Sequence, residues 1–327
     1  MPQNDLQRYE AALAAGDRAA ARRLVERLLE AGVAPAEVLT DVIAAAQRTV
    51  GIRWQTGEWT VAEEHAATAL SVSSVKVVMQ YVRRTPVTRG RVLIACAERE
   101  WHALPGMIIE CALRADGWET TQLGASTTPM RFNQYLQDIG PDVVAVSCSM
   151  LGALATTRRF IEASTAAGVP VVVGGAAFGW DDRRASALGA TAWARDARGA
   201  VAAMRGLPAV VAPVPKLPGG PSGEQAALEL EHRNLVAELH ARWSPAAAAD
   251  VDDALHQILH AVSAALLTGD PRPISHTVAW IEEFAGLRGI AAAEVRELGT
   301  LVAAVLRDYP QARELVDLHF AGGLTTD

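Results

Sequence analysis

Residues 91–106 have the sequence RVLIACAEREWHALPG, and this stretch decides the fold. The unbroken apolar run 92–96 is typical of a strand that is buried on both faces of a parallel sheet. A helix is expected to follow, from about 105 to 115. In open parallel sheets, ligands bind at the carboxyl ends of the strands, near the point where the strand order reverses. Because Glu100 and His102 come directly after such a strand, they are candidates for a ligand site.

Taken alone, the pair Glu100 and His102 fits two interpretations. It is either part of a polar surface loop, or a histidine metal ligand whose second ring nitrogen is oriented by the carboxylate. Two further motifs favour the metal ligand. They end the next two apolar strands along the chain: Ser149-Met150-Leu151 and Gly174-Gly175.

These three motifs resemble those of the cobalamin-binding domain family. The family pattern is Asp-x-His-x-x-Gly, then Ser-x-Leu, then Gly-Gly, at the ends of consecutive strands of a flavodoxin-like sheet. The chain departs from it at Glu100, which stands in place of Asp, and at Gly106, which comes one place late. A Glu-x-His variant is similar to the CarH-type cobalamin photoreceptors.

The resemblance implies roles for each matched residue. His102 is the lower axial ligand of cobalt, Glu100 orients it, and Trp101 lies beside them. The displaced nucleotide tail of the corrin passes Ser149 and Leu151. The remaining matched residues, which allow a close approach of the backbone, are Gly174 and Gly175.

Composition places the chain among globular proteins with two or three domains, since it has 327 residues and 50% hydrophobic content. No apolar run reaches the roughly 18 residues of a membrane helix, so we expect a cytoplasmic protein that does not enter membranes. The three cysteines, Cys96, Cys111 and Cys148, form no Cys-x-x-Cys pair. Neither a disulfide framework nor a zinc site is therefore expected.

Residues 1–85 are expected to form a four-helix bundle. Apolar residues recur at helical spacing, and the breaks fall near 16–17, 32–35 and 57–60. Asp17 and Thr60 are predicted N-caps, and Glu63 completes a capping box with Thr60.

The bundle contains Trp54, separated by nine residues from Glu64-His65. On its own this pattern fits a tryptophan packed at a helix end beside two solvated polar residues. In this context it resembles the helical cap that CarH-type photoreceptors place over the upper face of adenosylcobalamin. The resemblance implies that Trp54 packs on the adenosyl group and that Glu64 and His65 face the same pocket. The family has a histidine after the tryptophan, whereas this chain has Gln55, which puts a second histidine ligand after photolysis in doubt.

Strands and helices alternate through residues 90–207 and predict a five-stranded, doubly wound parallel sheet of flavodoxin-like type. The expected strands are 91–97, 119–124, 142–148, 169–174 and 190–195. The expected helices are 104–115, 128–139, 152–167, 180–188 and 197–205. A linker rich in proline and glycine, 208–223, follows.

Residues 224–327 are expected to be helical, in a bundle or globin-like domain of five or six helices. From Pro221 onward there are sixteen acidic residues and seven arginines, a net charge of −9. Nucleic-acid binding is not expected, because phosphate contacts need clustered lysine and arginine.

The C-terminal domain holds six of the eight histidines, and Asp252, His256 and His260 recur every four residues on one helix face. This face fits a hydrated polar stripe, a metal or haem site, or a pocket for a linear tetrapyrrole such as biliverdin. The domain contains no cysteine, so such a bilin would be held without a thioether bond. Apolar walls for a flat ligand are expected from Trp243, Trp280 and Phe284.

The order of cap, cobalamin domain and C-terminal helical domain resembles the photocobilins, which combine cobalamin with a bilin. The resemblance implies a light-sensing signalling protein without enzymatic activity, acting through a partner protein or enzyme and as a homo-oligomer, with a dimer expected. The alternative is a corrinoid carrier for a methyltransferase system. An adenosylcobalamin mutase subunit is disfavoured because no substrate barrel is predicted.

Overall fold

The computed structural model describes residues 3–243 and 251–320. The chain divides into two compact units, Met1–Val214 and Pro215–Asp327. The predicted combination of an α/β sheet with helical parts is confirmed, whereas the bundle and the sheet together form a single unit. No helix among the described residues has the length and apolar character that crossing a bilayer requires.

The first helices form the predicted bundle. Its elements are α1 (Gln3–Ala14), α2 (Arg18–Glu30), α3 (Pro35–Glu37), a π-helical turn (Val38–Ile43), α4 (Ala44–Gln55) and α5 (Val61–Val82). The third predicted helix is therefore one continuous run with a π-helical segment inside it. Both predicted caps are confirmed: Asp17 accepts from the N–H of Ala20 at 2.9 Å, and Thr60 forms a capping box with Glu63.

The bundle shares its hydrophobic core with helix α6 (Ala103–Ala115), which follows the first strand. Ile108 and Cys111 of α6 are buried in the same cluster as Leu39 and Ile43 of the bundle. Burial of these apolar side chains stabilises the association by roughly 25 cal/mol per Å² of apolar surface. The bundle is thus anchored to the helix that begins at His102.

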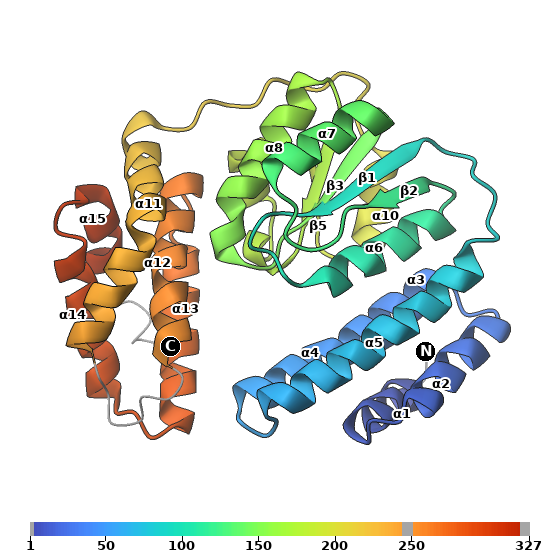
Figure 1. Ribbon diagram of the computed structural model, residues 1–327, viewed down its shortest axis with the longest axis horizontal. Helices are drawn as coiled ribbons and strands as arrows, with labels where there is room; N and C mark the ends of the chain where they lie inside the picture. Colours follow the sequence, from blue (N-terminus) through green and yellow to red (C-terminus); the bar gives the residue numbers. More distant parts are fainter. Residues whose placement is uncertain (1–2, 244–250, 321–327) are drawn as a thin grey trace. The chain divides into compact units, whose positions relative to one another are not determined.

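Five parallel strands form the sheet: β1 (Arg91–Cys96), β2 (Glu119–Gln122), β3 (Val143–Ser147), β4 (Val171–Gly174) and β5 (Ala192–Ala194). Their order is β2-β1-β3-β4-β5, so the doubly wound prediction is confirmed. Helices α6 and α10 (Ala197–Arg205) cover one face, and α7 (Pro129–Ile139) and α8 (Leu154–Ala166) cover the other (Figure 1). The order reverses between β1 and β3, where ligands bind in such sheets.

Two predicted boundaries differ from the structure. The helix expected at 180–188 is only α9 (Arg183–Ala187), preceded by a 3₁₀ turn at Ala176–Phe178. The expected linker 208–223 overlaps α11 (Gly219–Arg242). Proline is tolerated in a first helical turn, because the N–H that it lacks has no helical partner there. Pro221 therefore does not prevent the helix from starting early.

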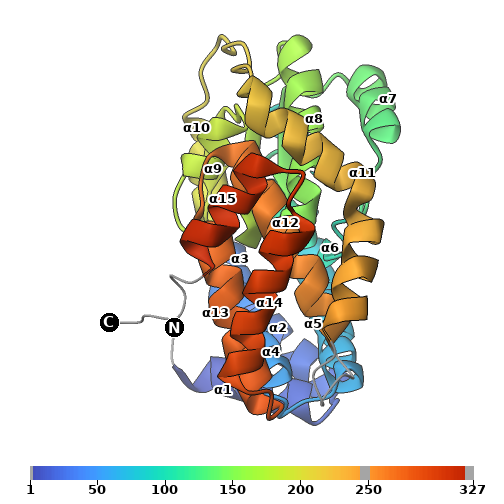
Figure 2. The same cartoon turned by 90° about the vertical axis from the view of Figure 1, so that its left-hand side faces the viewer.

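The second unit contains five described helices: α11, α12 (Val251–Thr268), α13 (Arg272–Leu287), α14 (Ala292–Val305) and α15 (Pro310–His319). The largely buried α12 packs against α11, α13 and α15 (Figure 2). Glu224 near the start of α11 accepts from the N–H groups of Gln311 and Ala312 at 3.1 and 2.9 Å. This carboxylate satisfies the first turn of α15, since helix N-termini favour negative charge.

Candidate functional site

The loops after β1 and β3 meet at the point where the strand order reverses. Cys96 and Ser147 are register partners at the ends of these two strands. The first loop carries Glu100 and His102, and the second carries Ser149. Gly174 ends β4 as the register partner of Ser147, so sheet topology places all three motifs predicted from the sequence at the ends of neighbouring strands.

Glu100 is the structural centre of these loops, and its side chain is 0% exposed. One carboxylate oxygen accepts from the backbone N–H of His102 at 2.8 Å and contacts its ring Nδ1 at 2.7 Å. The other oxygen accepts from the backbone N–H of Met150 at 2.9 Å and from that of Ser149. A buried carboxylate requires such donors to offset the loss of hydration. Glu100 therefore joins both loops through four contacts.

The surroundings of Glu100 and His102 favour the ionised form of the Glu100 carboxylate. Burial alone would raise the pKa of Glu100, but hydrogen bonds from His102 and Ser149 outweigh burial and hold that pKa below its ordinary value. The hydrogen bond to Glu100 raises the pKa of His102, burial opposes this effect, and the charges of Glu100 and Glu64 raise it further.

The ring of His102 has the orientation that a metal ligand needs. Its Nδ1 is held by Glu100, which leaves Nε2 for coordination, and 59% of the side chain is exposed. Carboxylate, histidine and metal in series is the usual arrangement around protein-bound metals, because the carboxylate fixes the ring orientation and raises the basicity of the ligand. The donor set therefore fits a metal such as the cobalt of a corrinoid.

The predicted cap residues lie on the hairpin formed by α4 and α5. Trp54 and Gln55 occupy the last turn of α4, and both are half-buried. Glu64 is half-buried in the first turn of α5 and accepts from the hydroxyl of Thr68 at 2.8 Å. His65 is 73% exposed, with Nδ1 lying 2.7 Å from a backbone carbonyl of the preceding turn.

The remaining predicted residues line the strand ends. Trp101 is 73% exposed, and Leu151 is half-buried at the start of a 3₁₀ turn. A Cβ on Gly174 would come within 2.5 Å of the carbonyl oxygen of Ala194, and a Cβ on Gly175 within 2.3 Å of that of Cys148. The atoms that approach these two glycines closely are therefore backbone carbonyls of neighbouring segments of the chain.

Sequence reasoning missed the contribution of the loop after β2. Ser126 donates its backbone N–H to the carbonyl of Glu100 at 2.8 Å, and its hydroxyl accepts from the N–H of Arg99 at 3.2 Å. Both Arg99 and Ser126 have positive φ, at 72° and 47°. Non-glycine residues adopt this conformation at a cost and cluster at functional sites. Only the short polar run 126–128 hinted at this loop in the sequence.

The three cysteines are free and buried. Burial raises the pKa of Cys96 to about 12 and raises the pKa of Cys148 as well. The thiols are therefore protonated at neutral pH and packed as small apolar groups.

In the second unit, the structure gathers only some of the predicted residues. His256 and His260 come together with His232 of α11, with one ring nitrogen of each within 4.8 Å of the others. Asp252 lies one turn before His256 on α12, and its carboxylate is 3.3 Å from Nε2 of His240 on α11. The expectation of a single Asp252, His256 and His260 site thus separates into two contacts, because α11 supplies different partners at each turn.

The aromatic candidates of this unit have structural partners. Trp243 is buried and its indole N–H donates to the carbonyl of Glu294 at 2.9 Å. The rings of Trp280 and Phe284 lie 5.2 Å apart on α13, and the guanidinium of Arg288 covers the Phe284 ring at 3.6 Å.

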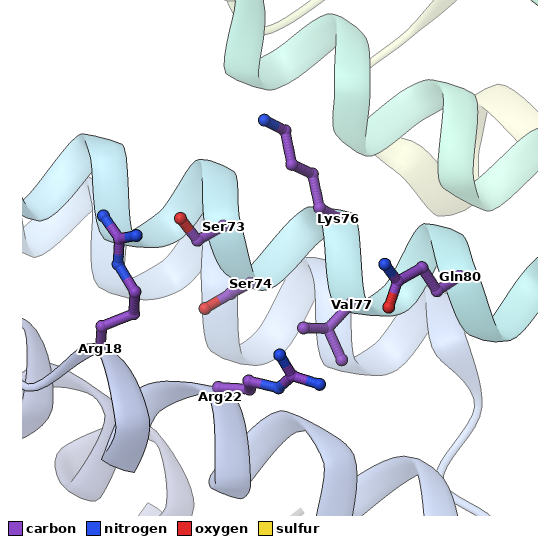
Figure 3. A pocket seen from close by; sticks show the side chains of 7 residues that line it. All are labelled: Arg18, Arg22, Ser73, Ser74, Lys76, Val77 and Gln80. Carbon is purple, nitrogen blue, oxygen red and sulfur yellow. The ribbon is translucent and has the colours of Figure 1, made fainter.

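A separate hollow of about 320 Å³ lies on the bundle, between α2 and α5 (Figure 3). It is lined by Arg18, Arg22, Ser73, Ser74, Lys76, Val77 and Gln80. None of the residues predicted to bind cobalamin lines it, so its position does not alter the assignment of the site.

Two segments match families of known function. Residues 5–78 and residues 90–205 match two families, each described as "B12 binding domain". These segments correspond to the bundle and to the sheet with its helices. The chain therefore carries a cobalamin-binding module, and residues from 206 onward lie outside both matches.

Individual relatives include proteins of two kinds. Trimethylamine corrinoid protein 2 of Methanosarcina acetivorans is 25% identical over 194 residues, which are 57% of this chain and 88% of that protein. The HTH-type transcriptional repressor CarA of Myxococcus xanthus is 32% identical over 131 residues, which are 39% of this chain and 43% of that protein. The structure of the monomethylamine corrinoid protein of Methanosarcina barkeri covers 62% of this chain and 98% of that protein, with a TM-score of 0.55 and 17% identity. That likeness shows a shared fold.

Proposed function

We propose that the protein is a light-sensing signalling protein that binds adenosylcobalamin between the helical bundle and the sheet. The observation that carries cobalamin binding is the contact between the buried carboxylate of Glu100 and Nδ1 of His102 at the strand end. The helix that follows His102 shares its hydrophobic core with the bundle, so both parts of the module adjoin this imidazole. Because Glu100 holds Nδ1, His102 would offer Nε2 to a metal, and it is the proposed ligand of the cobalt.

The chain's own residues hold and shield the cofactor. Glu100 keeps the His102 ring in one orientation, and its hydrogen bond to Met150 keeps the loop after β3 in place. In the proposal, the nucleotide tail of the corrin passes Ser149 and Leu151, and the paired glycines keep the nearby strand ends compact. Trp54, half-buried in the last turn of α4, would shield the bound cofactor from water.

When bound, adenosylcobalamin supplies a cobalt–carbon bond that visible light breaks. The role of the protein is to translate loss of the adenosyl group into a change of packing. Trp54 and Gln55 lie at the end of α4. The space that the adenosyl group leaves beside them would therefore change the packing of the α4–α5 hairpin. In this proposal the signal leaves through a change in oligomeric state or through a downstream protein.

The second candidate is a corrinoid methyl carrier that serves a methyltransferase. The trimethylamine corrinoid protein supports it, because the similarity extends over 88% of that relative. Two features favour the sensor instead. The Trp54 and Glu64-His65 pattern resembles the photoreceptor cap, and a second helical unit follows the matched segments.

For the second unit we propose non-covalent binding of a linear tetrapyrrole such as biliverdin. Support comes from the half-buried imidazoles of His256 and His260 and from the adjacent rings of Trp280 and Phe284. Imidazoles can hydrogen-bond pyrrole nitrogens and propionates, and aromatic rings can cover a flat ligand. In metal-free full-length protein, biliverdin should give a red-shifted band that survives gel filtration, and a band that is lost on gel filtration would argue against this part.

The test of the main proposal uses full-length protein loaded with adenosylcobalamin in the dark. Green light should change the absorption spectrum of the wild type, and His102→Ala should give a base-off spectrum with weaker binding. His276→Ala in the second unit is the matched control and should behave as the wild type. A base-on spectrum in His102→Ala would refute the ligand assignment. Equal affinity for methylcobalamin and adenosylcobalamin, with no response of the protein to light, would favour the methyl carrier.

A further inference from the structure

Three histidine side chains meet on the seam between α11 and α12. His232 belongs to α11, whereas His256 and His260 lie one turn apart on α12. Nε2 of His232 is 2.8 Å from Nδ1 of His256, and the ring of His232 stacks on that of His260 with centroids 4.2 Å apart. All three residues are half-buried. The cluster therefore combines proximity with partial exclusion of solvent.

Polar pairs on both sides of the cluster hold the two helices in register. The amide of Gln225 donates to the hydroxyl of Ser263 at 3.2 Å. His232 comes seven residues after Gln225, and His256 comes seven residues before Ser263. Seven residues are about two helical turns, so antiparallel helices repeat the same contact at this interval. On the other side of the cluster, Nε2 of His240 on α11 lies 3.3 Å from a carboxylate oxygen of Asp252 on α12. The packing of α11 against α12 thus holds the three histidines close together without a bound metal.

The chemistry of three adjacent imidazoles favours a metal ion. Each neutral ring has one nitrogen that is a lone-pair donor, and two histidines at positions i and i+4 chelate metal on one helix face. Imidazole suits zinc, copper, nickel and iron. Three histidines with an open fourth position is a ligand set found in zinc proteins. A hydrated polar stripe would not require a third histidine from the neighbouring helix.

We propose that His232, His256 and His260 bind one divalent transition-metal ion, for which Zn²⁺ is the probe, with the fourth position open to water. Nitrogens bound tetrahedrally to zinc lie about 3.3 Å apart, given zinc–nitrogen bonds of about 2.0–2.1 Å. The present separations reach up to 4.8 Å, so small rotations of the rings bring the nitrogens together. The 2.8 Å contact between the rings of His232 and His256 is then replaced by bonds from both rings to the metal.

Metal binding joins α11 to α12, so it stabilises the second unit by an amount that rises with the logarithm of the free metal concentration above Kd. This inference does not rest on cobalamin binding, because its residues all lie outside the cobalamin-binding module. A linear tetrapyrrole that used the same imidazoles would compete with the metal. The titrations are therefore made without bilin.

The experiment is a zinc titration of chelator-treated, cobalamin-free, full-length protein, measured by competition with a chromogenic chelator. We expect one tight equivalent in the wild type. His232→Ala, His256→Ala and His260→Ala should each weaken it at least tenfold, while the matched controls His240→Ala and His276→Ala should leave it unchanged. Circular dichroism checks that each variant is folded.

A second measurement protects the test against variants that do not fold. Zinc should raise the unfolding temperature of the wild type, and His260→Gln should remove this increase because an amide is a poor zinc ligand. Absence of a stoichiometric zinc site in the wild type would overturn the proposal. An equal loss of binding in His240→Ala and in the cluster variants would overturn it too.

Discussion

Glu100 accepts a 2.9 Å hydrogen bond from the backbone N–H of Met150, fifty residues further along the chain. The same carboxylate contacts the ring of His102 at 2.7 Å. A single buried side chain thus couples the orientation of a candidate metal ligand to the position of the loop after the neighbouring strand. A change in the conformation of either loop should therefore change the orientation of the His102 imidazole.

Replacing Glu100 with Gln should weaken cobalamin binding by about 10- to 100-fold, the usual effect of losing a residue that orients a metal ligand. The amide also turns an N–H group toward donors of the chain, so the free energy of unfolding should fall by about 1–3 kcal/mol. Affinity is measured by absorption titration and stability by denaturant unfolding. The half-buried neighbour Glu98→Gln is the control, and an equal effect there would contradict the role of Glu100.

Trp54→Ala should reduce the preference for adenosylcobalamin over methylcobalamin. The indole is proposed to cover the adenosyl group, and a tenfold loss of preference corresponds to about 1.4 kcal/mol. Competitive binding of the two cofactors in the dark measures this ratio. Trp59→Ala, on the loop of the same hairpin, is the control. An unchanged ratio in Trp54→Ala would remove the shielding role.

Gln55→His should make the illuminated protein retain cobalamin more firmly than the wild type. Imidazole is a far better ligand for transition metals than a carboxamide, and position 55 follows the proposed shielding tryptophan. Retention through gel filtration after green light is the measurement. If the wild type already retains cobalamin as firmly as the variant, another histidine must serve, and His65 is the first to test.

Gly175→Ala should be much more destabilising than Gly168→Ala. Both glycines have positive φ, at 112° and 74°, but an added Cβ meets the Cys148 carbonyl only at Gly175. A left-handed backbone costs a non-glycine residue about 1–2 kcal/mol, whereas Gly175, at φ 112° and ψ 167°, lies in a region that is essentially restricted to glycine. The clash adds to the cost only in the first variant. Urea unfolding of both variants gives the comparison. An equal decrease in the free energy of unfolding in both variants would show that the backbone at Gly175 relaxes around the added Cβ without cost.

Glu110→Gln should raise the free energy of unfolding at neutral pH. Burial raises the pKa of Glu110, and this outweighs the hydrogen bond to Thr120 and the charge of Arg83, which lower it. The folded protein therefore binds this proton more tightly than the unfolded chain, so the ionised carboxylate opposes folding at high pH. The advantage of the variant should shrink as pH falls through the raised pKa toward 4.5. Exposed Glu119→Gln is the control and should show no such trend.

Much of the fold followed from local patterns. The apolar run 92–96 predicted a buried parallel strand, and Thr60 with Glu63 predicted a capping box, because both depend on residues close in the chain. The three cobalamin-type motifs were also visible, since each is a short segment at a strand end. The boundaries of α9 and α11 were less predictable, because helix ends depend on packing and on partners from other elements.

The sequence by itself determined the alternation of strands and helices, the resemblance to cobalamin-binding domains and the shared face of His256 and His260. Only the tertiary structure decided that Met150 donates to Glu100, and that His232 completes a cluster while Asp252 lies beside His240. The physical reason is that periodicity specifies which residues share a face of one element. Strand order and helix packing specify which faces meet, and they depend on contacts between distant parts of the chain.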